Sequence, residues 1–388
     1  MSRCCSLKSS GVNTSSGRLV SSKKLPPEIH LIAFNILNIG RFKLGAMCVG
    51  GGRVSLENAI GYAKQRKAFN KVIADFGLVR EKIANMATLI YVGESLVYRT
   101  VALMDAALSE VDKSTADAAK QTLKAIEEYA VECSIIKVWG SEMIDYIVDE
   151  TLQIYAGYGF VEEYPAERAY RDARINRIFE GTNEINRLII TGFLLKRAMS
   201  GQLPLMPAIK HLMDEVLSGP SVAEELEGPL PEERKLVGQA KKLGLFAAGA
   251  ATQKYMQAIQ DQQEIMGAIA DMTIEGYAME TAVLRAQKIV ASKGEAAASL
   301  PIAMTRVYLA QAMEKIESAA RKVIAAVADG DMLRTQLAIL RRLAKYEPFN
   351  TVELRQQIDS IQMEPRISLA WCRCPQPSVR RHRPGSNP

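Results

Sequence analysis

The segment YPAERAYRDARINRIFEGTNEINRLIITGFLLKR, residues 164–197, is the most informative part of the sequence. At its centre, Glu180 lies between two bulky apolar residues and a glycine, and a helix with a typical start follows. Thr182 or Asn183 can cap that helix, and Glu184 falls in its first turn, where negative charge is favoured. The pattern predicts that Glu180 lies in an ordered turn among apolar side chains. A carboxylate in such a place suits proton abstraction next to a carbonyl, although a Glu before a helix is more often a simple turn residue.

Three further stretches carry recognisable patterns. Residues 34–41 read FNILNIGR, residues 66–69 read RKAF, and residues 153–160 read QIYAGYGF. Each stretch alone is a weak signal, because short matches also arise by chance. Together with residues 171–185, and in this order, they resemble the C-terminal part of the acyl-CoA dehydrogenase family. The first stretch is most similar to the very-long-chain branch of that family.

The resemblance implies an FAD-dependent acyl-CoA dehydrogenase of fatty acid β-oxidation. In this family the glutamate of the EGT motif removes the α-proton of a fatty acyl-CoA thioester, and the β-hydrogen leaves as hydride to FAD. Glu180 matches that catalytic base. The resemblance further implies an electron-transfer acceptor protein that reoxidises the flavin.

A second hypothesis belongs to a different class, a non-catalytic helical dimerisation or scaffold protein derived from the same family. It arises because members of the family carry an N-terminal helical domain and a β-domain before the region that this chain resembles. In this sequence only a short basic stretch precedes that region. We interpret the chain as a truncated form, with residues 1–28 disordered or non-native, and a mitochondrial presequence as the alternative. The expected localisation is cytoplasmic for a bacterial protein, or mitochondrial and peripheral to the inner membrane.

The resemblance also assigns cofactor-binding residues. Thr182 matches a position that contacts the flavin, and Arg66 and Phe69 match positions that reach the FAD of the neighbouring subunit. Gln153 and Gly157 match positions that approach the adenine end of the same FAD. An FAD shared between subunits implies a homodimer. From the residues alone, Arg66 and Phe69 would instead be an exposed helix end and a core phenylalanine.

Three other residues match substrate-binding positions. Asn38 and Arg41 match positions that line the entrance for the thioester and CoA, while an equally weighted alternative makes Arg41 part of a helix cap. Gly181 would let the thioester approach the backbone closely. A structural ion-pair cluster behind the base is expected from Arg171, Asp172 and Arg174.

The composition predicts an all-α fold. Of the 388 residues, 48% are hydrophobic and only 6% aromatic, so the core is mostly aliphatic, and long stretches are rich in helix-forming residues. Apolar residues recur at helical spacing, as in Val79, Ile83, Met86 and Ile90. We expect an antiparallel helical bundle followed by a second helical domain, with almost no strand. The three glycines at 50–52 lie within a helical pattern without a preceding strand, which favours close helix packing over a phosphate-binding loop.

Four parts of the chain are predicted from these patterns. After residues 1–28, residues 29–203 form the bundle and residues 204–362 the second helical domain, because prolines and a Pro/Gly/Glu-rich loop follow residue 203. Residues 363–388 form a disordered basic tail.

Charge and histidine distribution limit the partners. The net charge is +6, but residues 1–27 and 365–388 together contribute ten Lys and Arg and no acidic residue, so residues 28–364 carry −4. A mildly acidic body does not indicate nucleic-acid binding. The only histidines, at 30, 211 and 382, are scattered, which supports neither a metal site nor a Ser-His-Asp triad.

One segment is a candidate for peripheral membrane contact. Leu333, Leu337, Leu340 and Ala344 share a helical face with basic residues around it. The favoured alternative is that this face packs on its own domain.

Overall fold

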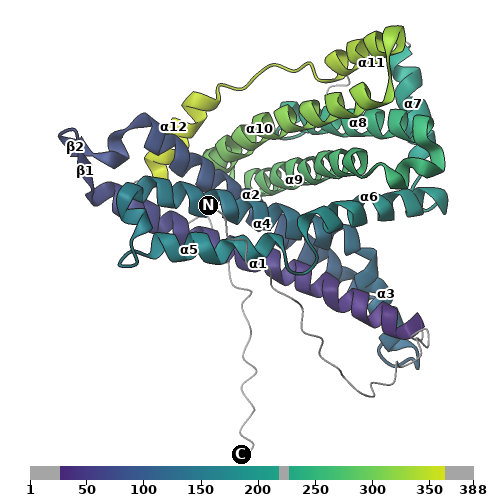
Figure 1. Cartoon of the computed structure of the whole chain (residues 1–388), viewed down its shortest axis with the longest axis horizontal. Coiled ribbons are helices and arrows are strands. Elements are labelled where there is room, and N and C mark those ends of the chain that lie inside the picture. Colours follow the sequence, from purple (N-terminus) through teal and green to yellow (C-terminus); the bar gives the residue numbers. More distant parts are fainter. Residues whose placement is uncertain (1–26, 218–226, 363–388) are drawn as a thin grey trace, which may run out of the picture.

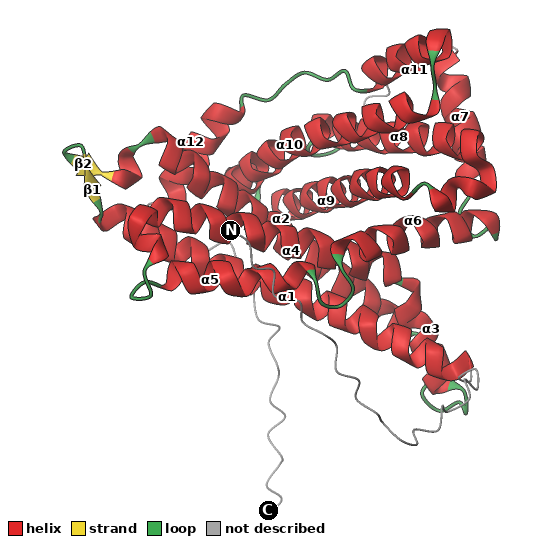
Figure 2. Ribbon diagram, viewed as in Figure 1, coloured by secondary structure: helices red, strands yellow, loops and turns green. Residues whose placement is uncertain are grey.

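The computed structural model describes residues 27–217 and 227–362, whose arrangement Figure 1 shows. Within these residues the regular structure is helical apart from one short hairpin (Figure 2). The predicted all-α fold class is therefore confirmed.

The first half of the described chain forms one helical unit. Its elements are, in order, α1 (Pro27–Gln65), β1 (Lys67–Ala68), β2 (Lys71–Val72), η1 (Ile73–Asp75), α2 (Gly77–Ser109), α3 (Ala118–Glu128), α4 (Ala130–Tyr155), η2 (Ala156–Phe160), α5 (Pro165–Ala173), η3 (Arg174–Arg177) and α6 (Asn183–Met199). The two strands pair as an antiparallel hairpin.

The second half adds another helical unit. Its elements are α7 (Leu205–Leu217), α8 (Pro231–Tyr255), η4 (Met256–Asp261), α9 (Gln263–Lys293), α10 (Glu295–Val327), α11 (Gly330–Leu343) and α12 (Thr351–Gln362). The chain then returns to the first unit, because α12 packs against α2 as well as α10 (Figure 1).

Glycines allow α1 and α4 to pack closely in the centre of the first unit. A Cβ atom added at Gly140 of α4 would lie 3.1 Å from the Cα atom of Gly45 of α1, and one added at Gly45 would lie 2.8 Å from the Ile136 carbonyl oxygen. Of the three consecutive glycines, Gly51 and Gly52 also face side chains of α4. The interpretation of this glycine run as close helix packing therefore holds for Gly52, where a Cβ atom would lie 3.1 Å from Ile147, and not for Gly50, where it would meet nothing within 4 Å.

The two units share one hydrophobic core. A single cluster of buried residues extends from Leu44 of α1 to Ile358 of α12. A buried polar chain crosses the same boundary: the indole of Trp139 on α4 donates to the Tyr308 hydroxyl at 2.8 Å, which donates to Glu275 of α9 at 2.6 Å. The units are therefore joined by packing and by satisfied polar contacts.

The chain breaks between α3 and α4 at Tyr129, whose φ of −97° and ψ of 20° leave the helical range. Cys133 belongs to α4, which continues without interruption to Tyr155.

The apolar face of α11 packs on its own unit, as the favoured alternative predicted. Leu340 is fully buried, and Leu333, Leu337 and Ala344 lie against the same core. None of the described helices combines the length and the apolar character needed to cross a bilayer.

We expect Gly45→Ala to destabilise the protein. The added methyl group would collide with the backbone of α4, and overpacking of this kind costs about 1–3 kcal/mol. Better helix propensity offsets at most about 1 kcal/mol of that. Gly50→Ala on the same helix is the control, because a Cβ atom there meets nothing within 4 Å. Urea unfolding of both variants tests this, and an unchanged stability of Gly45→Ala would contradict the close contact.

Candidate functional site

Glu180 lies in a strained turn. Its φ of +59° and the φ of +81° at Gly181 place both residues in the left-handed region, which is unfavourable for a glutamate by about 1–2 kcal/mol. Thr182 then caps α6, with its hydroxyl accepting from the Ile185 N–H at 3.4 Å. Of the two candidate caps, the structure selects Thr182.

Two buried side chains fix this turn through its carbonyl groups. The Nδ2 atom of Asn186, on α6, lies 2.8 Å from the Gly181 oxygen, 3.0 Å from the Thr182 oxygen and 3.4 Å from the Glu180 oxygen. From α1, the Nε of Arg41 donates to the Glu180 oxygen at 3.2 Å. The left-handed conformation is therefore supported from two helices.

The Glu180 side chain extends to the backbone of α1. A Cβ atom added at Gly40 would lie 2.5 Å from its Oε2 and 2.6 Å from its Cδ. A side chain at position 40 would therefore displace the Glu180 carboxyl group from this position. This contact gives the FNILNIGR stretch a structural meaning, because it supplies both Gly40 and Arg41 to the turn.

Asn38 and Arg41 lie close together, but Arg41 faces inward. Arg41 is 3% exposed, and its NH1 donates to the Asn38 Oδ1 at 3.0 Å. Burial lowers the pKa of Arg41, while nearby Cys133 and Glu180 act in the opposite direction. The Nδ2 of Asn38 has no hydrogen-bond partner among the described residues. A buried donor without a partner is available to a ligand carbonyl.

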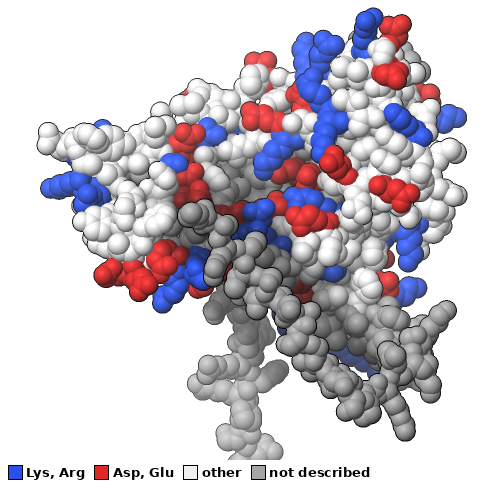
Figure 3. All heavy atoms as spheres, in the orientation of Figure 1, with Lys and Arg blue, Asp and Glu red and all other residues white. Residues whose placement is uncertain are grey.

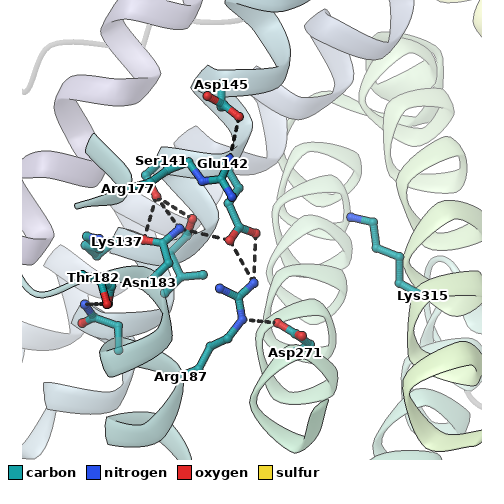
Figure 4. Close-up of polar contacts among 12 residues, drawn as sticks. Lys137, Ser141, Glu142, Asp145, Arg177, Thr182, Asn183, Arg187, Asp271 and Lys315 are labelled. Carbon is teal, nitrogen blue, oxygen red and sulfur yellow. Dashed lines mark hydrogen bonds and ion pairs between the residues drawn. The ribbon is translucent and has the colours of Figure 1, made fainter. Parts of the chain in front are cut away.

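A buried polar network lies beneath the start of α6 (Figure 4). Lys137 of α4 is fully buried, and its Nζ donates to the Asn183 Oδ1 at 2.6 Å. The Asn183 amide also contacts Ser141 at 3.0 Å and Glu142 at 3.0 Å. Sequence reasoning missed this network, although Lys137 is the single charged residue in the apolar run SIIKVWG.

The network continues to the second unit. Arg187 of α6 pairs with Glu142 at 2.9 Å and with Asp271 of α9 at 2.6 Å. Burial would lower the pKa of Arg187, but Glu142 and Asp271 raise it above its usual value. These three side chains line a cleft of about 1040 Å³ between the units (Figure 3). The turn that carries Glu180 is thereby connected to α9.

The predicted cofactor residues other than Thr182 lie elsewhere. Arg66 follows α1, and its guanidinium lies 5.2 Å from the ring centre of Tyr158, next to Gly157. A Cβ atom added at Gly157 would meet nothing within 4 Å, so its backbone is open to close approach. Gln153 is exposed, and Phe69 is 90% exposed instead of lying in the core.

The two groups of residues lie far apart in one chain. Gly40, beside the Glu180 carboxyl, and Gln65, just before Arg66, are both on α1 and are separated by roughly 38 Å along the helix. This distance exceeds the length of an extended dinucleotide. One FAD molecule therefore cannot contact Glu180 and Arg66 of the same chain.

Two expectations around the base are wrong. Arg171, Asp172 and Arg174 are exposed and form no ion pair among the described residues, because they lie on the outward side of α5 and η3. Arg177 makes the ion pair instead, with Asp145 of α4 at 2.9 Å. The apolar enclosure is also incomplete: Ile178 and Phe179 are 48% and 43% exposed. In the described residues, no group of three His, Cys, Asp or Glu has the geometry of a metal site.

Known proteins share both units. Residues 31–195 and 239–342 match two families that carry the same description, Acyl-CoA dehydrogenase, C-terminal domain. The chain belongs to the acyl-CoA dehydrogenase family. A probable acyl-CoA dehydrogenase of Bacillus subtilis is 46% identical over 329 residues, which is 84% of this chain and 55% of that protein. The rat mitochondrial very long-chain specific acyl-CoA dehydrogenase is 32% identical over 66% of this chain and 39% of its own length.

A solved relative shows the same arrangement of helices. The crystal structure of an acyl-CoA dehydrogenase from Bacillus anthracis, complexed with FAD, superposes with a TM-score of 0.83 at 46% identity, covering 86% of this chain and 57% of that one. The chain thus spans just over half the length of its Bacillus relatives. The acyl-CoA dehydrogenase C-terminal fold predicted from the motifs is confirmed.

Lys137 should make the free energy of unfolding depend on pH in the alkaline range. Burial lowers its pKa from 10.5 to about 8, so the folded protein loses this proton before the unfolded chain does. The cost of burying the charge is fully present below pH 8 and is relieved as the pH rises to 10.5, by an amount on the order of 3 kcal/mol. Lys137→Met should therefore be the more stable protein at pH 7, and its advantage should shrink by pH 10.

Urea unfolding at both pH values measures this, with the exposed Lys43→Met on α1 as the control for the loss of one charge. An advantage of Lys137→Met that is the same at both pH values would show that burial of the charge is not its cause.

Proposed function

We propose that this chain carries the catalytic base of an FAD-dependent acyl-CoA dehydrogenase that acts on fatty acyl-CoA thioesters. The observation that supports this most is the Glu180 turn, in which a strained backbone is fixed by Arg41 and Asn186 and the carboxyl group lies against Gly40. A turn that serves only as a connection has no reason to retain a glutamate in a left-handed conformation.

Glu180 acts as the general base in this proposal. Its carboxylate takes the α-proton of the thioester and becomes a carboxylic acid, while the hydrogen at Cβ leaves with its electron pair and a double bond forms between the two carbons. FAD, when bound, supplies the acceptor for that hydride. The Asn38 amide, whose buried Nδ2 has no partner among the described residues, and the Gly181 backbone are the substrate-binding groups of this proposal, and the Arg41 guanidinium positions the base through the Glu180 carbonyl.

The exposed residues at the other end of α1 fit an FAD that also contacts a second chain. Arg66 offers a guanidinium to a pyrophosphate, and Gly157 lets a nucleotide approach the backbone. Phe69 and Gln153 are exposed beside them, while Thr182 belongs to the Glu180 group. Because roughly 38 Å of helix separates the two groups, a homodimer in which each FAD contacts both chains accounts for both.

Turnover requires a further partner, because a reduced flavin must give up two electrons before the next cycle. We propose an electron-transfer protein in that role. A cytoplasmic location in a bacterium, or a mitochondrial one, stays a prediction.

Glu180→Gln should abolish most of the reaction. A fusion joins residues 29–362 to the part of the Bacillus subtilis relative that precedes the aligned region, and flavin bleaching by an acyl-CoA is followed. The amide keeps the size of the side chain but cannot accept the α-proton, so reduction should slow by about 10²–10⁴-fold. Glu184→Gln, in the first turn of α6, is the control and should reduce flavin at the parental rate. Equal rates for Glu180→Gln and the parent would favour the non-catalytic alternative.

Subunit mixing tests the shared cofactor site. Arg66→Ala and Glu180→Gln fusions are each expected to be inactive as homodimers. When they are co-expressed, every mixed dimer contains one site with both changes and one with neither, so roughly a quarter of all sites should be active. Recovery of activity on mixing supports a site built from two chains. If mixing restores nothing, then Arg66 and Glu180 do not serve one FAD across a dimer.

A further inference from the structure

We propose that a cavity between α6, α8 and α9 binds a single-chain anionic amphiphile, with the alkyl chain inside and the head group at Lys241. The cavity shares no residue with the Glu180 turn. Thr191, where α6 enters the cavity wall, is about 14 Å along the helix from Thr182. The inference therefore does not depend on the proposed function.

The cavity has a size and a lining that suit an alkyl chain. Its volume is about 330 Å³, near the lower end of the range for small-molecule sites. Aliphatic side chains from three helices and the turn before α7 form most of its wall, among them Leu194, Leu195, Leu203, Leu245, Ile269 and Met272. Mostly apolar walls favour a hydrocarbon over a sugar or a nucleotide.

Two helical glycines keep this space open. Gly276 of α9 is buried, yet a Cβ atom added there would meet nothing within 4 Å. At Gly244 of α8, an added Cβ atom would meet only the Cβ of Met272 at an ordinary 3.8 Å. A glycine inside a helix is less favourable than an alanine by about 1 kcal/mol, and no close contact requires one at either position. A side chain at either position would extend into the cavity, so the glycines preserve its volume.

One end of the cavity carries a positive charge. Lys241 is the exposed member of the lining, all of which the structure describes, and its side chain is 54% exposed. It pairs with Glu280, whose other oxygen accepts from Arg99 at 2.9 Å. Arg99 also lies near the buried Glu132 carboxylate, so the exposed Lys241 ammonium is the positive charge at the opening. An anionic head group matches that charge, and Lys241 keeps donors for it.

The experiment uses the full chain and dodecanoate as the probe, titrated by calorimetry below its micelle concentration. We expect saturable binding of one dodecanoate per chain, weaker binding of the six-carbon acid, and weaker binding of dodecylamine. Gly276→Leu should lower the affinity for dodecanoate at least tenfold, because the leucine occupies the space of the chain. Gly238→Leu on α8 is the matched control, since an added Cβ atom there is also unobstructed but Gly238 does not line the cavity.

Lys241→Gln separates the head-group contact from the apolar one. It should weaken the binding of dodecanoate several-fold and leave the binding of dodecanol unchanged. Thermal melting followed by circular dichroism confirms that each variant is folded, and Gly276→Ala replaces Gly276→Leu if the larger residue is not tolerated. The absence of saturable binding, or equal affinities for the Gly276 and Gly238 variants, would overturn the proposal.

Discussion

The contact between α1 and α4 is the constraint on which the rest of the structure depends. Gly45 and Gly140 let the two backbones approach to a distance that side chains would prevent. With α1 held there, Gly40 and Arg41 lie beside the Glu180 turn, and with α4 held there, Lys137 lies beneath the start of α6. One helix pair thus places the Arg41 support of the turn and the Lys137 contact to the start of α6, which explains why Arg41 and Glu180 are separated by 139 positions in sequence.

Polar contacts extend this arrangement to the second unit. Asn183 contacts Glu142, Glu142 pairs with Arg187, and Arg187 pairs with Asp271 of α9. Arg187 is the most buried of these charged groups, with 20% of its side chain exposed, whereas Glu142 and Asp271 are 38% and 46% exposed. Removal of either acid would therefore leave a partly buried guanidinium with one partner fewer. The second unit is therefore part of the environment of the turn and is more than an appended domain.

The sequence allowed the prediction of features that depend on local patterns. Helical periodicity and composition predicted the fold class, and the residues around Thr182 predicted the cap. Contacts between distant segments were not predictable in the same way. Nothing near Arg41 indicates that its guanidinium donates to a carbonyl 139 residues away, and the family resemblance assigned it to CoA. The ion pairs expected at residues 171–174 failed for the same reason, because Asp145 on another helix pairs with Arg177.

The left-handed backbone at Glu180 has a consequence for how this position can change. A glycine there would relieve the strain that the glutamate imposes, so the substitution that best suits the backbone is also the one that removes the carboxylate. Residues with β-branched side chains are the least compatible with this conformation. If the carboxylate is the base, selection for activity and selection for stability favour different residues at position 180. A gene copy that is no longer selected for activity would drift toward glycine or asparagine at this position.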